Sequence, residues 1–170
     1  MYKRYRVGIF TIDLMESVSN IYKEEKSMKT WVLYYSKGGN TKKIADAIAE
    51  EVEVLKTEQI PPAYPPENVQ LLFLGTGVYG GKPDPKMLEF IRTLNNNRVK
   101  NVAVFGTKGG QDTAIEAVKM MLKEKGINVI EETFSCKGKF FIFFNRNKPD
   151  SDDIKAAKAF ARRVYDSMKV

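Results

Sequence analysis

Three short segments combine glycine with hydroxyl and amide side chains, which are residue types that bind a phosphate group. They read SKGGNT at residues 36–41, TGVYGGKPD at 76–84 and TKGGQDT at 107–113. Gly38 and Gly39 allow the backbone to approach an anion closely, and free N–H groups and hydroxyls donate hydrogen bonds to it. One such segment is as well explained by the needs of a strand-to-helix turn, whereas three of them favour a ligand site.

The absence of certain residue types from the sequence limits the reactions that its side chains could catalyse. The chain has no histidine, so the commonest general base and metal ligand is absent. We therefore expect no metal site and no catalytic side chain, and we expect a bound cofactor to supply the chemistry. Cys136 is the one cysteine and cannot form an internal disulfide, which favours a reducing cytoplasm.

Charge and hydropathy limit the kinds of partner that the chain can be expected to bind. The net charge of +7 and the pI near 9.3 raise the question of nucleic-acid binding. Lysines and arginines are spread along the chain without a dense stripe or a nucleic-acid motif, so we expect no nucleic-acid partner. No apolar run approaches the ~18 residues of a membrane-spanning helix, so we expect no membrane span.

Apolar patterning predicts the elements that position these segments, and 170 residues are most simply one folded domain. Continuous apolar runs predict strands covered on both faces, and apolar residues at helical spacing predict helices between them. The predicted strands are 30–36, 52–56, 69–75, 101–107 and 127–134, and the predicted helices are 41–52, 84–94, 114–122 and one from about residue 151. This alternation indicates a parallel sheet with helices on both faces. The proline-rich IPPAYPPE at 60–67 predicts an extended crossover in place of a helix.

Ligands of an open parallel sheet bind beyond the carboxyl ends of its strands, and the three glycine-bearing segments lie there. At these segments the chain resembles the flavodoxin family, over about residues 30–168. The family's phosphate loop has a hydroxyl residue followed by serine or threonine, then glycine, asparagine and threonine. The matching residues here are Ser36, Gly39, Asn40 and Thr41, while Gly38 stands where the family usually has serine or threonine. The segments FLGTGVYGGKPDP and VFGTKGGQDT and the tail from FSCKGKF are also similar to family members.

The resemblance implies one noncovalently bound FMN and an open five-stranded parallel sheet in the order 2-1-3-4-5. The FMN would lie across the ends of the first, third and fourth strands. Ser36 and Thr41 would bond its phosphate, and Asn40 would brace the loop. The implied binding residues are Ser36, Lys37, Gly38, Gly39, Asn40, Thr41, Thr76, Gly77, Val78, Tyr79, Gly80, Gly81, Thr107, Lys108, Gly109, Gly110, Gln111 and Asp112.

Three features depart from the family. Electron-carrying flavodoxins are typically acidic, and this chain is basic. The family often stacks an aromatic residue of the fourth-strand loop on the flavin, where this chain has Gly109, Gly110 and Gln111. Tyr79 is the one aromatic residue of the three segments, and it either stacks on the flavin or is an ordinary surface tyrosine. The extended segment 60–67 replaces a helix that is common in the family.

Each of the three segments also holds a lysine: Lys37, Lys82 and Lys108. One interpretation is ordinary solvated loop charge. The other is that these lysines stabilise the anionic reduced flavin and make its reduction potential less negative than in an acidic flavodoxin. A basic surface would also favour a redox partner with an acidic docking face, or a small anionic substrate.

Residues 1–27 differ in pattern from residues 28–170, which form the predicted domain. The codons of Lys23 to Glu25 can contain the AGGAGG of a bacterial ribosome-binding site, and Met28 follows closely. We therefore expect residues 1–27 to be a translated leader, and the alternative is an ordinary strand or helix that packs on the domain.

Three functions remain open from the sequence. The first is an FMN-binding redox protein that carries electrons between protein partners. The second is an oxidoreductase that acts directly on a small anionic organic substrate, similar to a quinone or a tetrapyrrole. The third is a binding module that keeps the fold but has lost FMN. A yellow purified protein would exclude the third, and turnover of a small acceptor without a partner would separate the second from the first.

Overall fold

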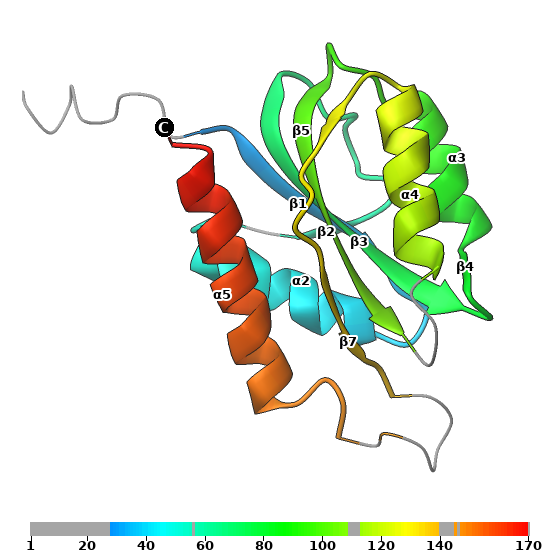
Figure 1. Cartoon of the computed structure of the whole chain (residues 1–170), viewed down its shortest axis with the longest axis vertical. Coiled ribbons are helices and arrows are strands. Elements are labelled where there is room, and N and C mark those ends of the chain that lie inside the picture. The colour runs from blue at the N-terminus through cyan, green and yellow to red at the C-terminus, as the bar shows by residue number, and fades with distance from the viewer. Residues whose placement is uncertain (1–27, 56, 109–112, 140–144, 146, 170) are drawn as a thin grey trace, which may run out of the picture.

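The computed structural model describes residues 28–55, 57–108, 113–139, 145 and 147–169, and the segment 1–27 lies outside this part. A parallel sheet forms the middle layer (Figure 1). Helices α2 (Asn40–Glu51) and α5 (Ser151–Ser167) cover one face, and α3 (Pro85–Thr93) and α4 (Thr113–Glu124) cover the other. None of these helices is long and apolar enough to cross a membrane.

The sheet confirms the predicted fold, and its strand order agrees in part with the prediction. Its strands are β1 (Thr30–Tyr35), β2 (Glu58–Gln59), β3 (Val69–Tyr79), β5 (Val99–Lys108), β6 (Asn128–Val129) and β7 (Phe134–Lys137). They lie in the order β2-β1-β3-β5-β6, with β7 also pairing with β5, and all of these pairs are parallel. With β6 and β7 taken as two parts of the fifth strand, this is the order 2-1-3-4-5.

Burial explains why the central strands were predictable. Residues 71–78 of β3 are all buried, because the helices cover both faces of the sheet. Phe73 and Phe105 from neighbouring strands pack with Phe160 of α5 on one face. Met87 of α3 and Val118 of α4 belong to the core on the other face. The two apolar layers hold the strand ends in fixed register.

The second predicted strand, 52–56, is wrong for residues 52–55, and residue 56 lies outside the described residues. The backbone N–H groups of Val52 and Val54 donate to the carbonyl groups of Ile48 and Ala49, so this segment terminates α2 instead of pairing with β1. Glu53 has a positive φ of 57° in this turn. Pairing with β1 begins later, at Glu58 in β2.

The fifth predicted strand, 127–134, is broken into β6 and β7. Between them Glu131 forms ion pairs with Lys119 and Lys123 of α4, and Glu132 pairs with Arg163 of α5. Residues 130–133 belong to neither strand, so the predicted strand is interrupted there. The crossover 60–67 contains no helix, as predicted.

The segment after the third predicted strand is a strand and a tight hairpin. β3 continues to Tyr79, four residues beyond its predicted end at 75, and pairs with the short antiparallel β4 (Lys82–Pro83). Gly80 and Gly81 form the turn with φ of 61° and 76°, which glycine adopts without strain. The hairpin projects past the end of β1, whose last partner in β3 is Thr76.

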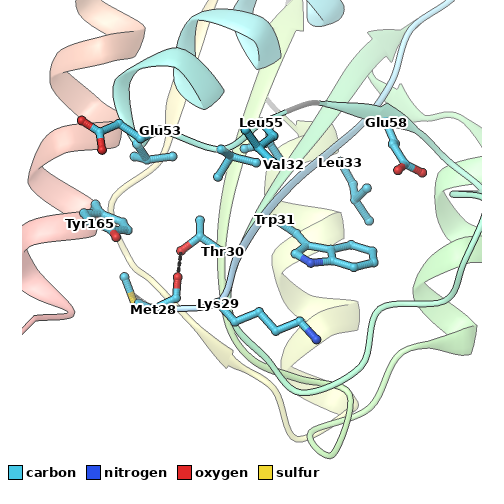
Figure 2. A pocket seen from close by; sticks show the side chains of 12 residues that line it. Met28, Lys29, Thr30, Trp31, Val32, Leu33, Glu53, Leu55, Glu58 and Tyr165 are labelled. Carbon is cyan, nitrogen blue, oxygen red and sulfur yellow. Dashed lines mark hydrogen bonds between the residues drawn. The ribbon is translucent and has the colours of Figure 1, made fainter. Parts of the chain in front are cut away.

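A cavity of about 620 Å³ lies beside the beginning of β1, at the end of the sheet opposite the glycine-bearing segments (Figure 2). Within β1, β2 pairs with Leu33 and Tyr34, and no strand of the described part of the chain pairs with the outer edge of the residues before them. Trp31, Leu55 and Tyr165 are among its lining residues. Its position separates it from the predicted ligand site.

Candidate functional site

The N-terminus of α2 is suited to an anion. Gly39 is its N-cap residue with a φ of 78°, no side chain caps it, and its first turn holds no acidic residue. By contrast, the carboxylate of Asp84 caps α3 and that of Asp150 caps α5. The first N–H groups of α2 therefore have no acceptor within the helix, and its dipole favours negative charge there. This donor set fits a phosphate group.

The hydroxyl groups divide between this opening and the interior. Ser36 lines a small pocket beside the α2 N-terminus. Thr41 is buried, and its Oγ1 atom is hydrogen-bonded to Thr107 Oγ1 at 2.8 Å. Thr76 is also buried and donates to the Gly77 carbonyl at 3.1 Å. The structure thus gives the Thr41 hydroxyl an internal partner that the sequence did not reveal, whereas Ser36 lies at the pocket.

The Asn40 side chain connects the phosphate loop to a segment that is distant in the sequence. Its Nδ2 atom donates to the Lys139 carbonyl at 2.9 Å, which ties the beginning of α2 to the segment after β7. A Cβ atom at Gly138 would lie 2.8 Å from Asn40 Nδ2, so a larger residue at position 138 would displace the Asn40 amide. Gly138 and Lys139 are therefore site residues that sequence reasoning did not single out, although they fall in the family-like tail.

The pocket brings together all three predicted segments. Its volume is about 80 Å³, and its lining residues are Ser36, Gly38, Asn40, Gly77, Val78, Tyr79, Thr107, Lys108, Gly138 and Lys139. Six other predicted residues flank it or lie in the same segments: Lys37, Gly39, Thr41, Thr76, Gly80 and Gly81. The predicted residues Gly109, Gly110, Gln111 and Asp112 lie outside the described residues.

Tyr79 lies over Gly77 at the edge of the pocket. A Cβ atom at Gly77 would lie 2.6 Å from the Tyr79 hydroxyl, so the tyrosine folds back over the glycine. The hydroxyl accepts a hydrogen bond from the Lys37 backbone N–H at 2.8 Å. The side chain is 36% exposed and joins the β3 hairpin to the phosphate loop. Its stacking on a flavin stays a prediction.

A buried carboxylate holds Lys37 over this tyrosine. The Lys37 ammonium lies 4.6 Å from the centre of the Tyr79 ring and 2.5 Å from Asp84 Oδ2. Asp84 is only 4% exposed, and its Oδ1 accepts a hydrogen bond from the Lys86 backbone N–H at 3.0 Å. Within the described part of the chain the Lys37 ammonium is the only partner of Oδ2. Sequence reasoning missed Asp84, whose signal was its place before a helix that begins with proline.

This pair changes the expected electrostatics. Burial alone would raise the pKa of Asp84, but the Lys37 hydrogen bond, the Lys86 N–H and their charges lower its pKa below the ordinary value. The hydrogen bond to Asp84 raises the pKa of Lys37. Both groups are charged at neutral pH, so Asp84 offsets the charge of Lys37. Of the three loop lysines, Lys37 therefore adds little net charge to the pocket.

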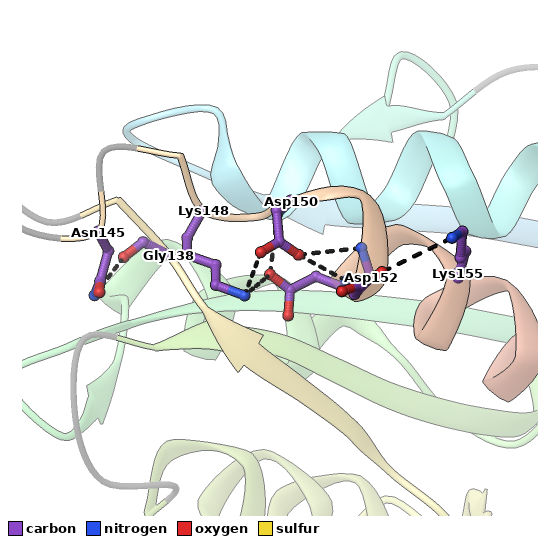
Figure 3. Close-up of polar contacts among 7 residues, drawn as sticks. Gly138, Asn145, Lys148, Asp150, Asp152 and Lys155 are labelled. Carbon is purple, nitrogen blue, oxygen red and sulfur yellow. Dashed lines mark hydrogen bonds and ion pairs between the residues drawn. The ribbon is translucent and has the colours of Figure 1, made fainter.

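Polar contacts fix the segment after β7 near the pocket (Figure 3). Asn145 Nδ2 donates to the Gly138 carbonyl at 3.4 Å. Lys148 Nζ pairs with Asp150 at 2.7 Å and with Asp153 at 2.9 Å, and the same two carboxylates form the capping box of α5. The Lys148 hydrogen bond, with N–H groups of the first turn, lowers the pKa of Asp150 to about 2. Contacts of Gly138 with Asn145, and of Lys148 with the start of α5, thus hold the described residues between β7 and α5 in place.

Comparisons with known proteins agree with this geometry. A family model described as a flavodoxin domain matches residues 31–141. The uncharacterized protein MJ0298 of Methanocaldococcus jannaschii is 33% identical over 150 residues, which cover 81% of this chain and 98% of that protein. A solved flavodoxin from the domain Archaea matches with a TM-score of 0.70 and 20% identity, covering 84% of this chain and 100% of that one. A flavoprotein of Lactobacillus acidophilus in complex with FMN matches with a TM-score of 0.51 and 22% identity, covering 65% of this chain and 93% of that one.

Proposed function

Because the chain belongs to the flavodoxin family, we propose that it binds FMN noncovalently and carries electrons between protein partners. The observation that carries this proposal is the uncapped N-terminus of α2, which opens beside Ser36 at the carboxyl end of the sheet. A phosphate group carries up to two negative charges, and these N–H groups and the helix dipole complement it. The flavin, when bound, supplies the ability to accept and return electrons.

The residues of the chain would bind and orient this cofactor. The N–H groups of Asn40 and Thr41 and the Ser36 hydroxyl would hold the phosphate. The β3 hairpin with Tyr79 would form one wall of the flavin site. The Thr41–Thr107 bond and the Asn40 contact would keep the loop in its binding geometry.

The described lining of the pocket contains no histidine, cysteine or carboxylate side chain. The chain has no histidine, and burial raises the pKa of the Cys136 thiol to about 12, so it stays protonated. This supports a carrier in which positioning and electrostatics are the protein's contribution. It leaves electron transfer at the flavin as the chemistry.

One observation favours a second candidate function, reduction or oxidation of a small anionic organic substrate. Lys108 and Lys139 line the pocket itself, where their charges would attract a carboxylate. Turnover of a carboxylated quinone by the FMN-loaded protein alone would favour this enzyme. Electron transfer that requires a second protein would favour the carrier.

Titration of FMN fluorescence with the cofactor-free protein tests the proposal. We expect saturable quenching, and we expect Ser36→Ala to weaken binding about ten- to a hundredfold, since a hydrogen bond to a charged group contributes about 1.5–3 kcal/mol. Ser151→Ala at the exposed start of α5 is the matched control. Absence of binding at saturating FMN would exclude a flavoprotein, and equal affinity of the two variants would place the phosphate elsewhere.

A further inference from the structure

The fold gathers lysines that are scattered in the sequence. Eight of them lie in the four segments that end the strands at the pocket, namely 36–43, 76–86, 106–108 and 136–139. They are Lys37, Lys42, Lys43, Lys82, Lys86, Lys108, Lys137 and Lys139, and we call this set the lysine rim. The same segments contain one carboxylate, Asp84, so their surplus equals the net charge of +7 of the entire chain.

Among the described residues, nearby carboxylates pair with Lys37 and Lys42 of this set. Asp84 is buried against Lys37, and Asp46 of α2 pairs with Lys42. The carboxylates at the start of α5 are engaged by Lys148 and by the helix cap. The side chains of Lys82, Lys86, Lys137 and Lys139 are exposed. Positive charge therefore remains around the pocket and accessible to a partner.

We propose that the lysine rim is a docking surface for an acidic redox protein, an inference that rests on the proposed electron-carrier function. The rim comes from the phosphate loop with α2, from the β3–β4 hairpin with the start of α3, and from the ends of β5 and β7. These elements surround the pocket, so a protein that docks on them also approaches the cofactor. The opposite charges of the two faces accelerate encounter and orient it.

The shape and composition of the rim favour a protein over the two other anionic partners. A small anion can contact one or two of these elements, whereas a protein face of about 800 Å² spans all of them. Single-stranded nucleic acid binds through stacked aromatic side chains as well as cations. Among the described residues of the rim segments the one exposed aromatic is Tyr79, and its ring is already covered by the Lys37 ammonium.

Two haem proteins of opposite charge serve as probes: acidic cytochrome b5 and basic cytochrome c. The FMN-loaded full chain is reduced with dithionite, freed of excess reductant and mixed with either ferric protein. One electron then passes from the reduced flavin to each ferric haem, which becomes ferrous and is followed by absorbance. We expect the rate with cytochrome b5 to fall about tenfold between 20 and 200 mM NaCl, and the rate with cytochrome c to rise.

Charge-reversal variants test whether the salt dependence of the cytochrome b5 rate comes from the lysine rim. Lys82→Glu with Lys137→Glu changes the rim at two exposed positions outside the pocket lining. Lys100→Glu with Lys125→Glu makes the same change in net charge at exposed positions near the start of β5 and after α4. We expect the rim pair to lower the cytochrome b5 rate about tenfold at 20 mM NaCl and the control pair to change it less than about twofold. Both pairs should keep the FMN affinity of the unaltered chain.

The other possible results would contradict either the docking surface or the proposed function. Equal effects of the two pairs, or a cytochrome b5 rate that does not depend on salt, would overturn the docking surface. The docking surface would also be overturned if the Lys82→Glu, Lys137→Glu variant lost binding to a DNA duplex while its rate with cytochrome b5 stayed unchanged. Calorimetric titration with ferric cytochrome b5 needs no flavin, so it tests docking even if FMN does not bind. A failure of FMN binding would overturn the proposed function alone.

Discussion

The hydrogen bond between Thr41 and Thr107 is the sharpest internal test of the site. Their Oγ1 atoms are 2.8 Å apart, and the residues are 1% and 5% exposed. Thr41→Val keeps the shape of the side chain but leaves the Thr107 hydroxyl without this partner. An unsatisfied buried hydroxyl costs about 1–3 kcal/mol, so we expect either single variant to lose stability of this size.

The double variant separates a shared bond from two independent effects. Thr41→Val with Thr107→Val removes both partners, so no hydroxyl of the pair is left unsatisfied. We expect the double variant to be more stable than the sum of the single effects predicts, by about 1–2 kcal/mol. Urea unfolding of the four cofactor-free proteins, followed by circular dichroism, measures this coupling. Additive losses would refute the bond as the link between α2 and β5.

The same four proteins decide the role of Thr41 toward FMN. The resemblance to flavodoxins implies a hydroxyl that bonds the phosphate, whereas the structure directs it to Thr107. If the hydroxyl only braces the loop, we expect both single variants to weaken FMN binding by similar factors of less than about ten. A loss of about ten- to a hundredfold in Thr41→Val, with Thr107→Val unaffected, would contradict the brace and restore the phosphate contact.

Three further predictions follow from other contacts. Gly138→Ala places a Cβ atom 2.8 Å from Asn40 Nδ2, so we expect loss of the Asn40 brace and about fivefold weaker FMN binding by fluorescence titration. The Lys148 bond lowers the pKa of Asp150 to about 2, so the stabilisation from Asp150 should be complete above about pH 4 and lost as the pH falls toward 2; Asp150→Asn should flatten this part of the melting curve against pH. Burial raises the pKa of Cys136 to about 12, so an aromatic disulfide reagent at pH 8 should react with it only after unfolding in urea, and rapid reaction of the folded protein would contradict its burial.

Central and peripheral elements differ in how far the sequence determines them. Residues 71–75 are apolar at every position because both faces of β3 are covered, and that pattern has one interpretation. At the periphery, the structure of a segment depends on which nearby groups its N–H groups and side chains contact. The N–H groups of Val52 and Val54 close α2, and Glu131 and Glu132 turn to lysines and an arginine of different helices. An apolar run does not record whether its N–H groups bond to a helix or to a neighbouring strand.

The candidate site shows the same division. The glycine turn and Asn40 lie in one continuous segment, so their place between β1 and α2 was predictable from local pattern. Asp84 depends on the distant Lys37, and a residue larger than Gly138 would displace the Asn40 amide. Long-range contacts of this kind produce no recognisable pattern of residue spacing in the sequence. Gly138 had a weak signal, a glycine between two lysines directly after a strand.

The distribution of charge was predictable from the sequence only in part. The spread of lysines along the chain predicted no nucleic-acid partner, and Lys37, Lys82 and Lys108 were expected near the cofactor, but Lys42, Lys43, Lys86, Lys137 and Lys139 were not connected with them. In a parallel sheet every strand ends at the same side, so lysines that follow β1, β3, β5 and β7 meet around one pocket. The acidic residues lie mainly elsewhere, as Glu53 after α2, Glu67 in the crossover and Glu124 at the end of α4 do. Charge counted separately for the two ends of each predicted strand would have located the lysine rim, because topology converts a regular spacing along the chain into a cluster in space.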